Sequence, residues 1–175
     1  FLGEHGMMDK RMFLEESLRM PFVIKYPKEI PAGKRIDDII LNIDFPSLLL
    51  DYAAISQPDS FQGKSFRKNL SLDTPSDWRK QMYYRYYAHA KNRPSHMGIR
   101  TNQHKLIFYY GHPLGLKGTY TKQTTPPAWE FYDLENDPME LSNQYNNIKN
   151  KVVIAQLKKD LLNLRTELGD AQTDT

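Results

Sequence analysis

Four short runs rich in β-branched and aromatic residues follow one another in the second half of the chain. They cover residues 82–87, 97–101, 105–110 and 129–134. Such runs favour β-strands, and connections that are short or rich in glycine and proline favour antiparallel pairing of neighbouring strands. The pattern therefore predicts a four-stranded antiparallel sheet.

The last part of the chain has a helical repeat. Between residues 146 and 168, apolar side chains recur at the spacing of one helix face. Asn146 or Asn147 can cap the start of this helix, and Gly169 can cap its end. The predicted apolar stripe consists of Ile148, Val152, Leu157, Leu161, Leu164 and Leu168. We expect this long C-terminal helix to pack on the sheet, in an α+β fold.

The first half of the chain predicts shorter elements. Residues 1–20 have the composition of a loop followed by a short helix. Residues 22–26, a β-rich run between two prolines, predict a strand. Residues 44–55 have helical spacing, with Asp44 as the expected N-cap and Pro46 in the first turn.

Composition narrows the classes of function. A chain of 175 residues is one domain's worth, and a hydrophobic content of 39% argues against disorder. The net charge of +3, from 24 basic and 21 acidic residues, is too balanced for a nucleic-acid-binding surface. No apolar stretch approaches the roughly 18 residues of a membrane span. We therefore expect neither a nucleic-acid partner nor a membrane partner.

Four segments, in order along the chain, resemble the formylglycine-dependent sulfatases. The first is Gly-Glu-His-Gly at 3–6 with Lys10, Glu15, Arg19 and Pro21. The second is the run 41–54, similar to the family's Asp-x-x-Pro-Thr-Leu-Leu-Asp-Leu-Ala-Gly helix but with Ser47 and Ala54 for Thr and Gly, and the third is Gln-Gly-Lys-Ser at 62–65. The fourth is Gly-Ile-Arg-Thr at 98–101 with Lys-Leu-Ile at 105–107, followed by Glu-Phe-Tyr-Asp-Leu-Glu-Asn-Asp-Pro-Met-Glu-Leu-Ser-Asn at 130–143. The resemblance implies the C-terminal part of an alkaline-phosphatase-like α/β enzyme.

In such an enzyme, this chain would begin shortly after a metal-binding Asp-His or Asp-Asn pair. Residues 1–78 would close the catalytic α/β domain, and residues 79–175 would form a C-terminal subdomain with the antiparallel sheet and the terminal helix. The Cys/Ser-x-Pro-x-Arg motif that matures to formylglycine does not occur, and the chain has no cysteine at all. The resemblance thus implies Ca²⁺ and formylglycine in the full-length enzyme, with no metal ligand here. We expect the chain alone to be inactive.

Lys10 is the candidate catalytic residue. Cleavage of a sulfate ester moves negative charge onto the leaving oxygen and the sulfuryl oxygens, and a fixed cation stabilises that transition state more than the ground state. The family's catalytic lysine stands nine residues before an arginine and eleven before a proline, as Lys10 does before Arg19 and Pro21. A solvated surface lysine is the alternative. Arg19 is expected to pair with Glu15, four residues earlier on one helix face.

Three residues are candidates for substrate binding. His5 could contact substrate or donate to the leaving oxygen, but the interpretation we favour is that it only holds the loop. His96 and Arg100 lie at the beginning of the second predicted strand, in a subdomain that contacts the sugar in related sulfatases. Arg100 has five donors for hydroxyls or a carboxylate, and its alternative role is a salt bridge at the strand edge.

Three functions are open at this point. The first is a sulfatase acting on a sulfated sugar or a glycosaminoglycan-type glycan. The second is a phosphoester or phosphonate hydrolase of the same superfamily, and the third is a non-catalytic carbohydrate-binding module. Besides a sulfated carbohydrate, we expect the rest of the same polypeptide, or another chain, to cover residues 1–55. The family implies a periplasmic, secreted or lysosomal location.

Overall fold

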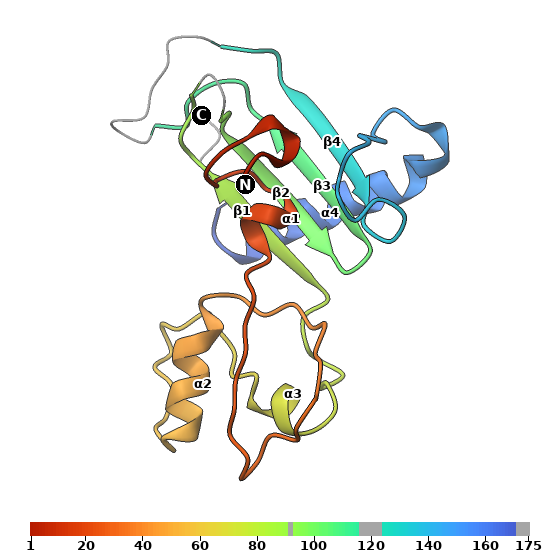
Figure 1. Ribbon diagram of the computed structural model, residues 1–175. Helices are drawn as coiled ribbons and strands as arrows, with labels where there is room; N and C mark the ends of the chain where they lie inside the picture. The colour runs from red at the N-terminus through yellow and green to blue at the C-terminus, as the bar shows by residue number, and fades with distance from the viewer. Residues whose placement is uncertain (91–92, 116–123, 171–175) are drawn as a thin grey trace. The chain divides into compact units, whose positions relative to one another are not determined.

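The chain folds into two compact units in a computed structural model (Figure 1). The sheet unit comprises Phe1–Pro21 and Gln81–Thr175, and the helical unit comprises Phe22–Lys80. The structure describes residues 1–90, 93–115 and 124–170. Each unit has its own apolar core.

A four-stranded antiparallel sheet forms the centre of the sheet unit. Its strands are β1 (Gln81–Tyr86), β2 (His96–Thr101), β3 (His104–Tyr109) and β4 (Ala128–Asp133). They lie side by side in chain order, and every neighbouring pair is antiparallel (Figure 1). The predicted sheet is confirmed, and each strand begins one residue earlier than predicted.

One face of the sheet is covered by α4 (Lys151–Glu167), the predicted C-terminal helix. The residues that α4 buries are Ile154, Leu157, Leu161 and Arg165. Leu157 and Leu161 of the predicted stripe are confirmed, and Leu164 packs against the same core, but Ile148 and Val152 are 77% and 83% exposed. Ile148 belongs to a separate 3₁₀ turn, η2 (Ile148–Asn150), which the Asn147 side chain caps. The helix therefore begins later than predicted, and in its first turns Ile154 packs on the sheet in place of Ile148 and Val152.

The opposite face of the sheet is covered by the N-terminal segment. This segment contains η1 (Glu4–Gly6) and α1 (Glu15–Leu18). The predicted loop followed by a short helix is confirmed. Phe13 is fully buried and stacks on Tyr84 with ring centroids 5.0 Å apart. It lies against Gly98, where an added Cβ would come within 2.4 Å of the ring. Only glycine at this position of β2 lets the segment approach so closely.

The sheet unit resumes at Gln81, close to the predicted domain boundary between residues 78 and 79. The first 21 residues, however, belong to the sheet unit, where Met12, Phe13 and Leu14 pack on the sheet. The division of a full-length protein into a catalytic domain ending at residue 78 and a C-terminal subdomain stays a prediction.

The helical unit contains α2 (Asp44–Tyr52) and α3 (Arg67–Ser71). The predicted helix of residues 44–55 is confirmed, although it ends at Tyr52. The predicted strand of residues 22–26 is wrong: these residues adopt no regular structure. A strand needs a hydrogen-bonded neighbour, and none is present among the described residues. Phe22 instead packs edge to face on the rings of Phe45 and Phe66.

Asp44 is a buried anchor and not the N-cap of α2. Its carboxylate accepts hydrogen bonds from the backbone N–H groups of Leu41, over 2.7 Å, and Lys64, over 2.9 Å. It also forms a two-point ion pair with Arg79. The N-cap position belongs to Ile43, which makes no side-chain capping bond. The predicted cap was wrong because these tertiary partners engage the carboxylate.

Candidate active site

The loop of residues 1–11 folds back on itself and is tied to α1. Leu2 and Met8 form an isolated antiparallel bridge near its start. At its end, the Arg11 N–H donates to the Ser17 hydroxyl over 2.9 Å. These contacts hold the backbone at Met8 and at Arg11, on either side of Asp9 and Lys10.

Lys10 lies between two residues with left-handed backbone. Asp9 has a φ of 82° and Arg11 a φ of 88°, a region that non-glycine residues seldom occupy. Such conformations cost on the order of 1–3 kcal/mol each and cluster at functional sites. The Lys10 side chain is exposed and forms no hydrogen bond or ion pair within the described part of the chain. The loop thus presents an unengaged cation, although its catalytic role stays a prediction.

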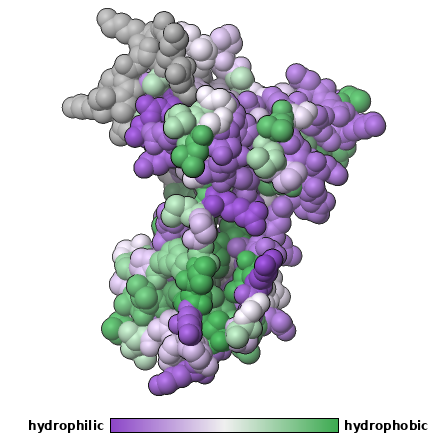
Figure 2. Space-filling model, in the orientation of Figure 1, coloured by the Kyte–Doolittle hydropathy of each residue, from purple (hydrophilic) through white to green (hydrophobic). Residues whose placement is uncertain are grey.

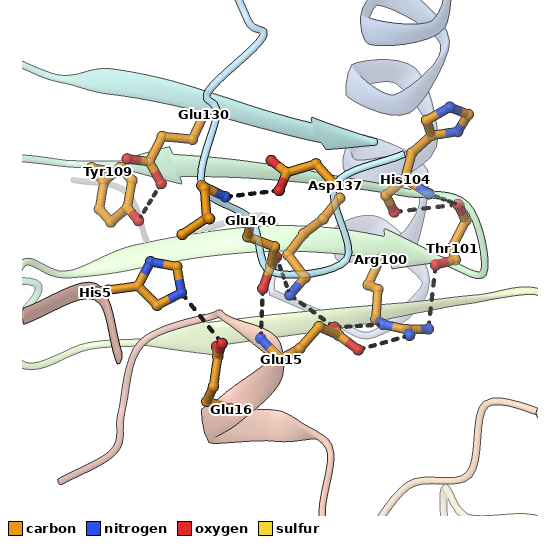
Figure 3. Close-up of polar contacts among 12 residues, drawn as sticks. His5, Glu15, Glu16, Arg100, Thr101, His104, Tyr109, Glu130, Asp137 and Glu140 are labelled. Carbon is orange, nitrogen blue, oxygen red and sulfur yellow. Dashed lines mark hydrogen bonds and ion pairs between the residues drawn. The ribbon is translucent and has the colours of Figure 1, made fainter. Parts of the chain in front are cut away.

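His5 holds the loop against α1. Its Nε2 lies 3.4 Å from Glu16 Oε1, as Figure 3 shows. This contact is an ion pair when the imidazole is protonated. The ring also meets Phe1 edge to face, with centroids 5.9 Å apart. These contacts support the loop-holding interpretation, and substrate binding by His5 stays a prediction.

Arg100 is held by Glu15. Its Nε and Nη2 donate to the two carboxylate oxygens over 2.9 Å each, in the parallel arrangement drawn in Figure 3. The predicted pairing of Glu15 with Arg19 is wrong, because α1 is a single turn and Arg19 lies exposed beyond its end. The salt bridge considered as the alternative role of Arg100 is the contact observed. Substrate binding by Arg100 stays a prediction.

Lys105 and Glu140 extend this pair into a buried network. Lys105 Nζ lies 2.9 Å from Glu15 Oε1 and 2.6 Å from Glu140 Oε1. The other oxygen of Glu140 accepts the Glu15 backbone N–H over 2.6 Å. The side chains of Lys105 and Glu140 are both 0% exposed. Two carboxylates and two cations, counting Arg100, therefore balance each other between α1 and the sheet.

The two carboxylates of the network titrate differently. Burial disfavours the charge of Glu15, but hydrogen bonds from Arg100 and the charge of Lys105 outweigh it and lower the Glu15 pKa to about 2. Burial raises the pKa of Glu140 above its ordinary value, and the nearby Lys105 offsets only part of that effect. Glu15 is therefore the firmly ionised partner, and Glu140 depends on Lys105 for its charge.

His96 is enclosed by aromatic rings. The ring centroids of Tyr84, Tyr86 and Tyr109 lie 5.7, 5.5 and 5.6 Å from that of His96. Its Nδ1 lies 2.7 Å from the carbonyl of Pro94, so this nitrogen carries the proton. Burial lowers the His96 pKa to about 4, against the effect of the Pro94 bond. The imidazole is thus neutral near pH 7 and closed off from solvent, and its predicted contact with substrate stays a prediction.

The described residues do not fit the groups that the sulfatase resemblance implies. Within residues 1–90, 93–115 and 124–170, no three histidine, aspartate or glutamate side chains gather where they could hold a metal ion. The chain offers no cysteine for conversion to formylglycine. In the same ranges, no helix has both the length and the apolar character to cross a membrane.

Sequence reasoning named Lys105 and Glu140 only as parts of family-like segments and missed their contacts with Glu15. The one available signal was that Lys105 alternates with Ile107 and Tyr109, so that a charge falls on a covered face of β3. Glu140 gives no such signal, because it lies outside regular structure and adopts a φ of 53°. Its role depends on contact with a residue 125 positions away.

Comparison with known proteins shows that the sequence and the fold of the chain are similar to those of sulfatases. A family model described as N-sulphoglucosamine sulphohydrolase, C-terminal, matches residues 3–167. An N-acetylglucosamine-6-O-sulfatase of Bacteroides thetaiotaomicron is 40% identical over 171 residues, which cover 95% of this chain and 28% of the relative. The structure of BT4656 in complex with its substrate D-glucosamine-2-N,6-O-disulfate is similar with a TM-score of 0.87 and 36% identity, over 99% of this chain and 33% of that one.

A phosphonate monoester hydrolase of Agrobacterium radiobacter shares the fold at 19% identity, with a TM-score of 0.60 over 78% of this chain and 27% of that one. The chain spans about a third of the length of the sulfatase relatives that it matches. The predicted fold, the C-terminal part of an alkaline-phosphatase-like sulfatase with a four-stranded sheet and a long terminal helix, is confirmed.

Proposed function

We propose, since the chain belongs to the N-sulphoglucosamine sulphohydrolase C-terminal family, that it is part of a sulfatase that hydrolyses sulfate esters on a sulfated sugar. The observation that carries the proposal is Lys10, an exposed cation on a strained and hydrogen-bonded loop within the matched residues. Ca²⁺ and formylglycine belong to the full-length enzyme in this proposal. The chain alone is expected to be inactive.

The role of Lys10 follows from charge. As the sulfur–oxygen bond breaks, negative charge grows on the leaving oxygen and on the sulfuryl oxygens, and Lys10 Nζ stabilises it by contact with a sulfuryl oxygen. The neighbouring carboxylate does not compete for this cation. Asp9 is engaged instead by Arg93, at 3.3 Å, and by Arg11, at 3.7 Å. Because contacts hold the loop backbone before substrate arrives, only the Lys10 side chain has to adjust when substrate binds.

The substrate class is a sulfated amino sugar, as a single unit or within a glycosaminoglycan-type glycan. The support is the 40% identical N-acetylglucosamine-6-O-sulfatase and the likeness to BT4656 with its disulfated glucosamine. His5 lies on the same loop as Lys10 and is the better placed of the predicted sugar contacts. Contact through His96 or Arg100 would require the ring cage or the Glu15 pair to open.

The other two functions have less support. The phosphonate hydrolase shares the fold at 19% identity, whereas the sulfatase relative is 40% identical. A carbohydrate-binding module would need free aromatic faces, but the described tyrosines of the sheet are engaged in the fold. Tyr84 stacks on Phe13, and the hydroxyls of Tyr109 and Tyr83 donate to Glu130 and Asp170.

The remainder of the polypeptide is proposed to cover the helical unit. Phe22, Val23 and Leu49 are 48%, 92% and 67% exposed in this unit. Figure 2 shows apolar residues gathered over one of its faces, more than isolated surface residues require. The family further supports a periplasmic, secreted or lysosomal location.

The test uses the full-length protein and three substrates: 6-O-sulfated N-acetylglucosamine, a small aryl sulfate and a phosphonate monoester. Sulfate hydrolysis should exceed phosphonate hydrolysis. Lys10→Ala should lower kcat on both sulfates by roughly 10²-fold, the scale of losing one preorganised electrostatic partner. Lys159→Ala, which removes an exposed lysine on α4, is the matched control. A higher rate on the phosphonate would replace the proposal with the phosphonate hydrolase, and an unchanged Lys10→Ala would remove Lys10 from the mechanism.

A further inference from the structure

We infer that Glu140 and Lys105 are positioning residues for the Lys10 loop, acting through Glu15 and α1. The inference rests on the proposed function, because it assigns these buried charges to the reaction of Lys10. Neither residue touches the loop itself in the described contacts. Their effect passes along a chain of hydrogen bonds that ends beside Lys10.

The first link joins the turn that follows β4 to the start of α1. Glu140 Oε2 accepts the N–H of Glu15, the first residue of α1, over 2.6 Å. In Figure 3, the Glu140 carboxylate points toward the backbone N–H of Glu15, whose own side chain points toward Arg100. This bond fixes the direction in which the helix leaves the sheet face.

The second link joins α1 to the loop. The hydroxyl of Ser17, two residues further along α1, accepts the N–H of Arg11 over 2.9 Å. Arg11 follows Lys10 directly and has a φ of 88°. A shift of α1 would therefore act on the strained backbone that presents Lys10.

The network has a fixed geometry that apolar packing alone does not supply. Phe13 and its apolar neighbours bury the segment, but apolar contacts are not directional. The ion pairs of Lys105 with Glu15 and Glu140 permit one arrangement, because all three groups are largely or fully buried. The Phe13 ring, 5.3 Å from Lys105 Nζ, helps to shut out water.

The backbone at Glu140 indicates that the carboxylate is required there. Its φ of 53° is strained for any residue with a side chain. Glycine would relieve the strain but would leave the Glu15 N–H without its acceptor. The turn is held in this shape by the Asp137 carboxylate, which accepts the N–H groups of Leu141 and Ser142 over 3.0 and 2.8 Å.

The experiment compares two double variants of the full-length protein. The glutamine variant combines Lys105→Met with Glu140→Gln, and the leucine variant combines Lys105→Met with Glu140→Leu. Both variants leave Arg100 and Glu15 as a neutral pair, and both keep the strained backbone at residue 140. They differ in whether residue 140 can accept the Glu15 N–H. Leu157→Ala, on the opposite face of the sheet, is the control for lost stability. The readouts are kcat and KM on 6-O-sulfated N-acetylglucosamine, Tm, and hydrogen exchange of a peptide covering residues 12–18.

The leucine variant should have a kcat at least about tenfold below that of the glutamine variant, since small misplacements of catalytic groups have effects up to about 10²-fold. Its KM should stay within about threefold, and residues 12–18 should exchange faster than in the Leu157→Ala control at the same loss of Tm. Equal kcat in the two double variants, a loss confined to KM, or exchange equal to that of the control would overturn the inference.

Two other results of the experiment also decide the inference: a leucine variant that does not fold, and a wild-type protein without sulfatase activity. If the leucine variant does not fold, Ser17→Ala replaces it, because it removes the acceptor of the Arg11 N–H without disturbing a buried charge. A kcat reduced about threefold or more would support the inference, and an unchanged kcat would overturn it. If the wild-type protein cleaves no sulfate ester, the proposed function itself fails and the inference falls with it. That result is distinct from an active wild type with unaffected variants.

Discussion

The guanidinium of Arg100 and the carboxylate of Glu15 meet in two parallel hydrogen bonds of 2.9 Å each, although 85 residues separate them in the chain. The pair ties α1 to β2, next to the loop that carries Lys10. Its two-point geometry is specific to the guanidinium group, since an ammonium group cannot make both bonds in one plane.

Arg100→Lys in the full-length protein should lower the free energy of unfolding by about 1–3 kcal/mol, because one carboxylate oxygen of Glu15 loses its charged donor. The charge itself is kept, and Lys105 still pairs with Glu15. Arg19→Lys, at an exposed position, serves as the control and should have no effect. Urea unfolding measures both. Equal stability of the two variants would show that the Glu15 pair contributes little.

Acid should destabilise the protein in two steps. His96 has a folded pKa of about 4, below its ordinary 6.5, so its contribution is present above pH 6.5 and is lost as the pH falls toward 4. Glu15 has a folded pKa of about 2, below its ordinary 4.5, so its contribution is lost as the pH falls from 4.5 toward 2. Protonation of His96 should lower the free energy of unfolding by roughly 3 kcal/mol at most.

His96→Phe keeps the aromatic packing but cannot take up a proton, so it should flatten the step between pH 6.5 and 4 and leave the lower step in place. Unfolding curves across this pH range measure the effect. An unchanged upper step would assign it to another group. In the same variant, a raised KM for a sulfated oligosaccharide with an unchanged KM for a small aryl sulfate would support the predicted sugar contact of His96.

Gly98→Ala should destabilise the protein by about 1–3 kcal/mol, the usual cost of overpacking a core. The new methyl group would lie 2.4 Å from the Phe13 ring and 2.7 Å from the Leu106 carbonyl oxygen. Combining it with Phe13→Leu should restore part of the loss, since only the carbonyl contact then remains. Thermal unfolding of the single and double variants tests this. A fully tolerated alanine would mean that the segment can move away from β2.

Val23→Asp should strongly destabilise the full-length protein, by about 2 kcal/mol or more, if the rest of the polypeptide covers this side chain. In the helical unit the side chain is 92% exposed, so the substitution would cost little without such a cover. Ser60→Asp, at an exposed polar position of the same unit, is the control and should be neutral. Equal Tm values for the two variants would contradict the proposed cover.

The sequence by itself determined the four strands of the sheet, their antiparallel order and the existence of the long C-terminal helix. The spacing of apolar side chains is a local signal of these elements, and connections that are short or rich in glycine and proline favour pairing of neighbouring strands. It also placed Lys10 at the recognisable spacing from Arg19 and Pro21, because that spacing lies within one short segment.

Only the tertiary structure decided which groups meet. Nothing local distinguishes Arg100 from Arg19 as the partner of Glu15, or indicates that Glu140 reaches the start of α1. The β-rich run of residues 22–26 stays irregular because a strand exists only beside a partner. The Asp44 carboxylate pairs with Arg79 and accepts hydrogen bonds from two backbone N–H groups instead of capping its helix. Buried polar groups take the partners that the folded chain brings within reach, since leaving them unpaired is costly, and those partners lie far away in the sequence.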